Sequence, residues 1–93
     1  MLRVWGLIRK NNRIVQDMVA ECQENDIEQE EALYSCVHEI CYEFDLQRPI
    51  WLPKNQREYE DYKRIVLTQD NFIEPIDFDT LELEILSDED EKY

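Results

Sequence analysis

The fold prediction depends most on the stretch LRVWGLIRKNNRIVQDMVAEC, residues 2–22. This stretch consists of two runs rich in apolar residues, joined by Lys-Asn-Asn at residues 10–12. Asparagine tolerates the left-handed backbone conformation that a tight hairpin needs. We therefore expect a β-hairpin with strands over about residues 2–9 and 13–22.

A three-residue loop would fix the register of this hairpin and gather apolar side chains on one face. The expected pairs are Ile8 with Ile14, Val4 with Met18, and Leu2 with Ala20. The second face carries charged residues, but it also carries the apolar residues Trp5, Leu7, Val15 and Val19. That face is too apolar to be fully solvated, so we expect part of it to be covered by the C-terminal half of the chain or by a partner.

A helix is expected to follow the hairpin, over about residues 27–45. Asp26 and Gln29 form a capping-box pattern, and Pro49 stops the helical pattern soon after Phe44. An apolar stripe at helical spacing is formed by Leu33, Val37, Ile40 and Phe44. This stripe should lie on the apolar face of the hairpin. Gly6 indicates close packing or a bulge in the first strand.

The C-terminal half is expected to complete the fold with shorter elements. Residues 50–52 lie between two prolines and predict an extended edge segment or a loop that caps the core. Residues 53–62 have a weak helical pattern, and residues 64–68 read as a short strand. In residues 81–86, LELEIL, the alternation predicts a strand with its leucines on the core and Glu82 and Glu84 in water.

Together these elements predict a small α+β domain. Its parts are an N-terminal β-hairpin, one long amphipathic helix, and a small antiparallel sheet that C-terminal strands complete. We expect residues 1–86 to form this single domain and residues 87–93, SDEDEKY, to form a disordered acidic tail.

The charge of the chain limits its partners. Ten basic residues against 23 acidic ones give a formal net charge of −13. A field of that sign repels nucleic acid and anionic membranes and favours encounter with basic proteins, although solubility alone also explains it. The N-terminal apolar run is broken by Arg3, so no signal peptide or membrane span fits. The odd number of cysteines, three, indicates reduced thiols and a cytoplasmic protein.

Few residues can support catalysis or metal binding. The one histidine, His38, falls inside the predicted helix beside Ser35 and Glu39, a spacing that does not assemble a nucleophile, a base and an orienting group. Cys36 and His38 point about 200° apart on a helix and cannot share a metal ion. Buried cysteines that pack as small apolar side chains are the better interpretation. We therefore expect no enzymatic activity and no cofactor.

The candidate partner-binding residues are acids of the predicted helix and two tryptophans. They are Glu31, Glu39, Glu43, Asp45, Trp5 and Trp51. Acids near the C-terminal end of a helix oppose its dipole, which suggests that they have another use. Tryptophans often supply the centre of a protein interface, although packing inside the same chain would also explain both of them.

Four stretches read together suggest a family resemblance: RVWG, EICYEFDLQRPIWLPKN, DNFIEPIDFD and LELEIL. With them the chain resembles, almost end to end, a group of short acidic bacterial proteins that carry no assigned activity. We expect a non-enzymatic cytoplasmic adaptor or regulator that binds a basic or mixed-charge protein. One way in which it could bind is by mimicking the charge of nucleic acid. The alternative is a homodimeric structural protein that buries the face around Trp5.

Overall fold

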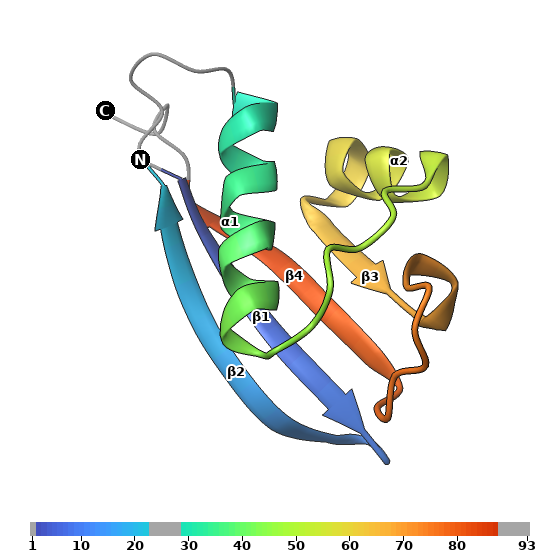
Figure 1. The fold of residues 1–93 in the computed structure, drawn as a ribbon. Helices are drawn as coiled ribbons and strands as arrows, with labels where there is room; N and C mark the ends of the chain where they lie inside the picture. Colours follow the sequence, from blue (N-terminus) through green and yellow to red (C-terminus); the bar gives the residue numbers. More distant parts are fainter. Residues whose placement is uncertain (1, 23–28, 88–93) are drawn as a thin grey trace.

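The computed structural model describes residues 2–22 and 29–87, with the backbone alone at residues 29, 30 and 87 (Figure 1). It is a small α+β fold in which two helices pack on one antiparallel sheet of strand order β2-β1-β4-β3. The elements in chain order are β1 (Leu2–Lys10), β2 (Arg13–Cys22), α1 (Gln29–Glu43), α2 (Pro53–Tyr62), β3 (Arg64–Leu67), a short 3₁₀ helix (Gln69–Asn71) and β4 (Thr80–Ser87). The N-terminal hairpin and the completing C-terminal strands are therefore confirmed.

The hairpin turn is shorter than the sequence predicts. Asn11 and Asn12 alone form it, with φ of 54° and 66°, the positive values that a two-residue type I′ turn requires. The predicted register is consequently wrong by two residues: Val4 pairs with Ala20, and Ile8 pairs with Gln16. A shift by two keeps each side chain on its face, so the predicted apolar face survives along most of the hairpin.

An irregularity in the hairpin changes the position of one predicted core residue. The register between β1 and β2 shifts between Ile8 and Arg9, so that Ile14 pairs with Arg9 instead of Ile8. A β-bulge of this kind inserts one extra residue and reverses the faces beyond it. Ile14 therefore lies on the second face with 46% of its surface exposed.

The helical part differs from the prediction of one long helix. α1 ends at Glu43, about two residues before its predicted end, after which Asp45 adopts a φ of 62° and the chain turns back. The predicted capping residue Asp26 lies outside the described residues. The second helix, α2, has the bounds expected for residues 53–62. It is capped at its end by Lys63, which has a φ of 54°.

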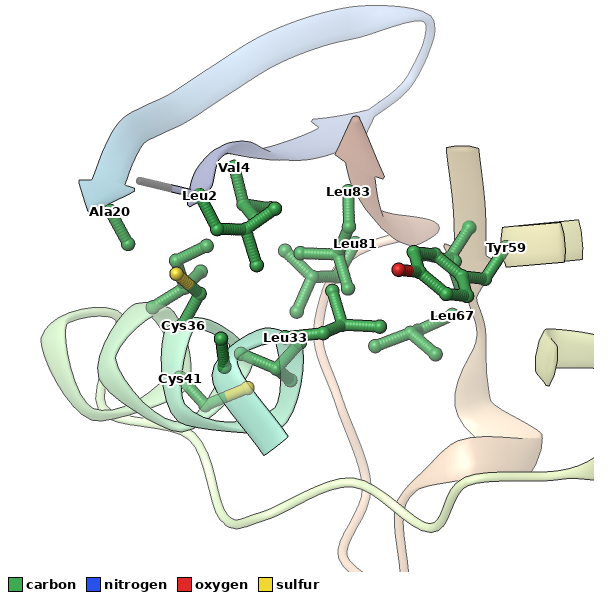
Figure 2. Close-up of a cluster of buried hydrophobic side chains, with 14 of the residues drawn as sticks. Leu2, Val4, Ala20, Leu33, Cys36, Cys41, Tyr59, Leu67, Leu81 and Leu83 are labelled. Atoms are coloured by element: carbon green, nitrogen blue, oxygen red, sulfur yellow. The ribbon is translucent and has the colours of Figure 1, made fainter. Parts of the chain in front are cut away.

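The core lies between the sheet and the two helices (Figure 2). β1, β2 and β4 contribute Leu2, Val4, Ala20, Leu81 and Leu83; the helices contribute Ala32, Leu33, Cys36, Val37, Ile40, Cys41 and Tyr59. α1 approaches β1 so closely that a Cβ atom placed on Gly6 would lie 2.7 Å from Cγ2 of Ile40. Of the two expectations for Gly6, close packing is therefore confirmed, and the register irregularities of β1 lie elsewhere, between Arg3 and Val4 and between Ile8 and Arg9. Burial of one such leucine or isoleucine side chain contributes about 1.5–3 kcal/mol.

Two buried asparagines hold the irregular segments of the C-terminal half in place. Asn55 of α2 and Asn71 of the 3₁₀ helix are both fully buried. Nδ2 of Asn71 donates hydrogen bonds to Oδ1 of Asn55, at 2.8 Å, and to the carbonyl oxygen of Ile50, at 2.7 Å. Their side-chain oxygens accept hydrogen bonds from the backbone N–H groups of Leu52 and Thr68. The segment before α2 is thereby fixed as a loop and not as an edge strand.

Of the predicted tail, residues 87–93, the structure describes only Ser87. Ser87 belongs to β4, so the strand extends one residue past the predicted domain boundary at 86. Residues 88–93 lie outside the described residues. Neither helix in the described ranges has the length and apolar character needed to cross a membrane.

Candidate functional site

The predicted partner-binding residues do not gather into one site. Three of them, Glu31, Glu39 and Glu43, lie along α1, while Asp45 follows its C-terminal end. Trp5 lies on the face of the sheet that the helices leave uncovered, and Trp51 packs against α1 from the segment before α2. The structure thus offers three surfaces: an acidic ridge, an open sheet face, and a cleft that shares Glu31 with the ridge.

The acidic ridge consists of Glu31, Glu39 and Glu43, which follow one row of α1 with Ser35 between them. Residues four apart on a helix are displaced by about 40°, so this row slants across the exposed side of α1. All three glutamates are exposed, and none has an ion-pair partner among residues 2–22 and 29–87. The last turn of α1 contains no basic residue, so the negative end of the helix dipole adds to their charge.

The open sheet face is the side of the sheet that lies opposite the two helices. It consists of Trp5 on β1 and of the side chains of β1, β2, β3 and β4 that lie on the same side of the sheet as Trp5. Nε1 of Trp5 donates a hydrogen bond of 2.9 Å to Oδ2 of Asp17 on β2. Val19, beside Trp5, is 43% exposed. No described segment covers this face; β4, which was expected to cover it, extends the sheet beside β1 instead. Among the described residues, an apolar strip of this face, Val19 and Ile14, is exposed, whereas Leu7 is only 3% exposed.

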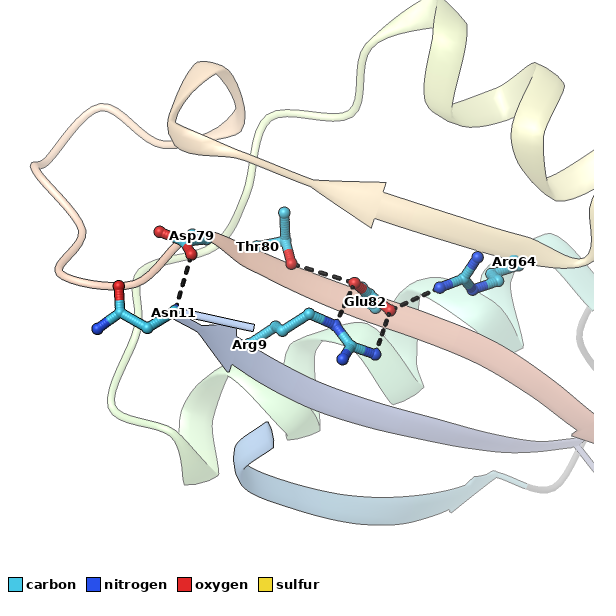
Figure 3. Close-up of polar contacts among 6 residues, drawn as sticks. All are labelled: Arg9, Asn11, Arg64, Asp79, Thr80 and Glu82. Carbon is cyan, nitrogen blue, oxygen red and sulfur yellow. Dashed lines mark hydrogen bonds and ion pairs between the residues drawn. The ribbon is translucent and has the colours of Figure 1, made fainter. Parts of the chain in front are cut away.

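Glu82 occupies the middle of the open sheet face, and its position corrects the expectation that it lies in water (Figure 3). It is only 7% exposed and lies between two arginines. Oε2 is 3.0 Å from Nε of Arg9, and Oε1 is 2.7 Å from Nη2 of Arg64. Burial alone raises the pKa of the Glu82 carboxyl, but the hydrogen bonds and charges of the two arginines outweigh it and lower that pKa below its ordinary value. Because all three residues are paired, we interpret this cluster as structural.

The two edges of the sheet are protected differently. Along β3, Oε1 of Glu58 accepts a hydrogen bond of 3.1 Å from the N–H of Val66. Nδ2 of Asn55 donates to the carbonyl oxygen of the same residue at 3.4 Å. These α2 side chains occupy the edge groups that another strand would otherwise pair with. No described residue does the same for β2, so β2 is the accessible edge.

The cleft, which we call the aromatic cleft, has a volume of about 490 Å³. It lies between α1 and the segment before α2, and its lining consists of Glu31, Tyr34, Ser35, Val37, His38, Arg48, Pro49 and Trp51. The rings of Tyr34 and Trp51 meet edge to face with centroids 5.5 Å apart. Nε1 of Trp51 donates a hydrogen bond of 3.1 Å to Oε1 of Gln56, which fixes the indole. Of the predicted site residues, only Glu31 and Trp51 meet here.

Sequence reasoning missed Tyr34, His38 and Arg48 as members of a common site. A signal was present, because Tyr34 and His38 are four residues apart and therefore adjacent on one side of a helix. Arg48 carried no such signal. Its position depends on how the chain turns back after α1, which local sequence patterns do not specify.

The remaining chemistry is sparse. Cys36 and Cys41 are buried, as expected, and burial raises the pKa of the Cys41 thiol to about 11, so it stays protonated near neutral pH. Within the described ranges, no group of three or more His, Cys, Asp and Glu residues is placed to hold a metal ion.

No protein-family model, curated protein or solved structure matches the chain. Its function must therefore be argued from the three surfaces themselves. The resemblance to short acidic bacterial proteins stays a prediction.

Proposed function

We propose that the protein is a small, non-enzymatic, cytoplasmic adaptor or regulator that binds a basic or mixed-charge protein through the acidic ridge of α1. The observation that carries this proposal is that Glu31, Glu39 and Glu43 are exposed and without a cation among the described residues. Glu82, by contrast, is neutralised by two arginines. In the described part of the chain, the buried carboxylate is therefore paired and the glutamates of the ridge are not.

The geometry of the ridge supports electrostatic recognition. Glu39 and Glu43 are one helical turn apart, about 6 Å along the axis, on a helix that packs firmly on the sheet. Fixed charges of one sign accelerate encounter with a basic surface and align the partner, and their contribution falls as salt screens them. Such a row would also suit a partner whose groove ordinarily holds nucleic-acid phosphates. Asp45, just beyond the helix, adds to the same field.

The test is capture of a basic protein from native lysate of the source cells at about 0.1 M and about 1 M salt, concentrations that differ strongly in screening. The double variant Glu39→Lys with Glu43→Lys changes the net charge from −13 to −13 + 4 = −9. A matched control, Asp61→Lys with Glu74→Lys, makes the same change at exposed positions outside α1. We expect one basic protein to be enriched at low salt by the wild type and the control, and lost with the ridge variant.

Two results would count against an acidic-ridge adaptor. Equal loss of capture in the ridge variant and the control would mean that net charge matters and the ridge does not. The absence of any salt-sensitive partner would favour solubility as the role of the acids.

A second candidate function, a homodimeric structural protein, is favoured by one specific observation. The open sheet face carries exposed Val19 beside Trp5 and exposed Ile14 beyond the bulge. In the described part of the chain, the adjoining edge of β2 is unprotected. A second copy that packed on this face would bury the apolar strip. Size-exclusion chromatography with light scattering should then report a dimer that persists at high salt and dissociates in Trp5→Glu. A monomer at every concentration would eliminate this candidate.

A further inference from the structure

The aromatic cleft is well formed, and neither the acidic ridge nor the open sheet face explains it. Its volume of about 490 Å³ lies within the range of about 300–1,000 Å³ typical of small-molecule sites. Tyr34, Val37, Pro49 and Trp51 supply apolar walls. Because Gln56 holds the Trp51 indole and Tyr34 packs against its ring, the walls are ordered before any ligand arrives.

The polar groups of the cleft are arranged with one end cationic and the other anionic. The chain turns back after α1 and runs beside it toward α2 (Figure 1). Trp51 meets Tyr34, and Arg48 precedes Trp51 by three residues, or about 10 Å of extended chain. Arg48 therefore lies toward the level of His38, about 6 Å along the helix from Tyr34. Glu31 lies one turn beyond Tyr34 in the other direction.

Arg48 is the group in the cleft best suited to bind a ligand. It lines the cleft, it is exposed, and no residue in the described parts of the chain forms a hydrogen bond or ion pair with its side chain. A guanidinium recognises a carboxylate or sulfonate through two parallel hydrogen bonds. The His38 ring, which carries an N–H in either tautomer, can add a third donor.

We propose that the aromatic cleft binds a small aromatic anion, a planar ring system with a carboxylate or sulfonate at one end. The ring lies against Tyr34 and Trp51, and the anionic group meets Arg48 and His38. Glu31 repels a second negative group at the opposite end, so the ligand carries its charge at one end only. A cationic ligand is disfavoured by Arg48. The cleft shares Glu31 with the acidic ridge, but the groups that bind the ligand, Arg48, His38, Tyr34 and Trp51, lie outside the ridge.

The two tryptophans provide an internal control for the test. Trp51 lines the aromatic cleft, and Trp5 lies on the opposite side of the sheet. In a ¹H–¹⁵N spectrum of the full chain each indole N–H gives one signal, which Trp51→Phe assigns. We would titrate the protein with 2-naphthoate and, separately, with 2-naphthamide, which has the same ring and nearly the same shape without the charge.

We expect 2-naphthoate to shift the Trp51 indole signal in a saturable manner and to leave the Trp5 signal unchanged. Replacing Arg48 with glutamine should weaken 2-naphthoate binding about tenfold, the effect of one charge-assisted contact at a partly exposed site. The matched control Arg57→Gln removes an exposed arginine of α2 outside the cleft and should leave the affinity unchanged. Unchanged dispersion of the remaining signals would show that each variant is folded.

Three results would overturn the proposal. A shift of the Trp5 signal without the Trp51 signal would place the ligand on the open sheet face. Equal affinity of the wild type for 2-naphthoate and 2-naphthamide would show that the anionic group is not recognised. Equal affinity of the wild type and Arg48→Gln for 2-naphthoate would show the same. No shift of either signal at millimolar 2-naphthoate would show that the cleft does not bind this class of ligand.

Discussion

Nδ2 of Asn71 donates a hydrogen bond of 2.8 Å to Oδ1 of Asn55, and both side chains are fully buried. Through this pair, α2, the segment before it and the 3₁₀ helix are fixed to one another. Because Ile50 and Trp51 belong to that segment, the asparagine pair also determines the wall of the aromatic cleft. A buried polar pair in the C-terminal half therefore supports a candidate site on α1.

The first prediction concerns this pair. Asn71→Ala leaves the carbonyl of Ile50, the N–H of Thr68 and one oxygen lone pair of Asn55 without their hydrogen bonds. Since an unsatisfied buried polar group costs about 1–3 kcal/mol, we expect the free energy of unfolding to fall by about 3 kcal/mol. Urea unfolding measures it, with the exposed Lys54→Ala as control. A loss below about 1 kcal/mol would mean that water replaces these bonds.

The second prediction follows from Glu82. Its folded-state pKa is lowered by Arg9 and Arg64 against the opposing effect of burial. A carboxyl with a lowered folded-state pKa adds stability above its unfolded-state pKa, near 4.3, and loses it as the pH falls through the folded-state pKa. We expect wild-type stability to decline below about pH 4 with a component that Glu82→Gln lacks.

Near neutral pH, Glu82→Gln should lower the free energy of unfolding by about 1 kcal/mol, a modest value because both arginines reach solvent. The neighbouring Glu84→Gln, on the same face of β4 and without a charged partner in the described structure, serves as control. Identical pH profiles for the wild type and Glu82→Gln would show that the arginines do not stabilise the charged form.

The third prediction tests the close approach of α1 to the sheet. Gly6→Ala places a methyl group 2.7 Å from Cγ2 of Ile40, so the helix or the side chain must move. Overpacking of this kind lowers the free energy of unfolding by about 1–3 kcal/mol. In a double-mutant cycle, Gly6→Ala should be much less destabilising in the Ile40→Ala background. Equal effects in both backgrounds would show that the strand accommodates the methyl group without Ile40.

The sequence predicted those elements whose determinants are local. Asparagines mark the hairpin turn, apolar spacing marks Leu33, Val37 and Ile40, and alternation marks β4. The predicted register of the hairpin was wrong because the sequence Lys-Asn-Asn does not show how many of these residues form the turn and how many still belong to the strands. A shift by two, unlike a shift by one, left the faces of the hairpin intact up to the bulge.

The errors at single residues arise from tertiary contacts. Glu82 was expected in water because alternation identifies the face of a strand on which a residue lies but not the neighbours of that residue. The arginines that cover Glu82 come from the two neighbouring strands, β1 and β3. The aromatic cleft was missed for a similar reason. Arg48 joins Tyr34 and His38 only because Asp45 turns the chain and the asparagine pair holds the returning segment.

The last prediction separates stability from function on the acidic ridge. Glu43 ends α1 and Glu39 lies one turn before it, so that their charges oppose the helix dipole, and the last turn contains no basic residue to compensate. Lysine reverses this interaction, so we expect Glu43→Lys to raise the free energy of unfolding by about 0.3–1 kcal/mol at low salt and Glu39→Lys to raise it by less, because the effect of the dipole falls off within the last turn. The gain should shrink as ionic strength increases.

Urea unfolding of Glu39→Lys and Glu43→Lys, at about 0.05 M and about 0.5 M salt, measures this gain. The control pair Asp61→Lys and Glu74→Lys removes the same charge from the net total and shows how much comes from relief of overall repulsion. If the ridge variants have a higher free energy of unfolding than the control pair and yet fail to capture the partner, the glutamates destabilise the fold and are needed for binding. If they are destabilised, the ridge makes a structural contact, and its acids would not be free to serve a partner.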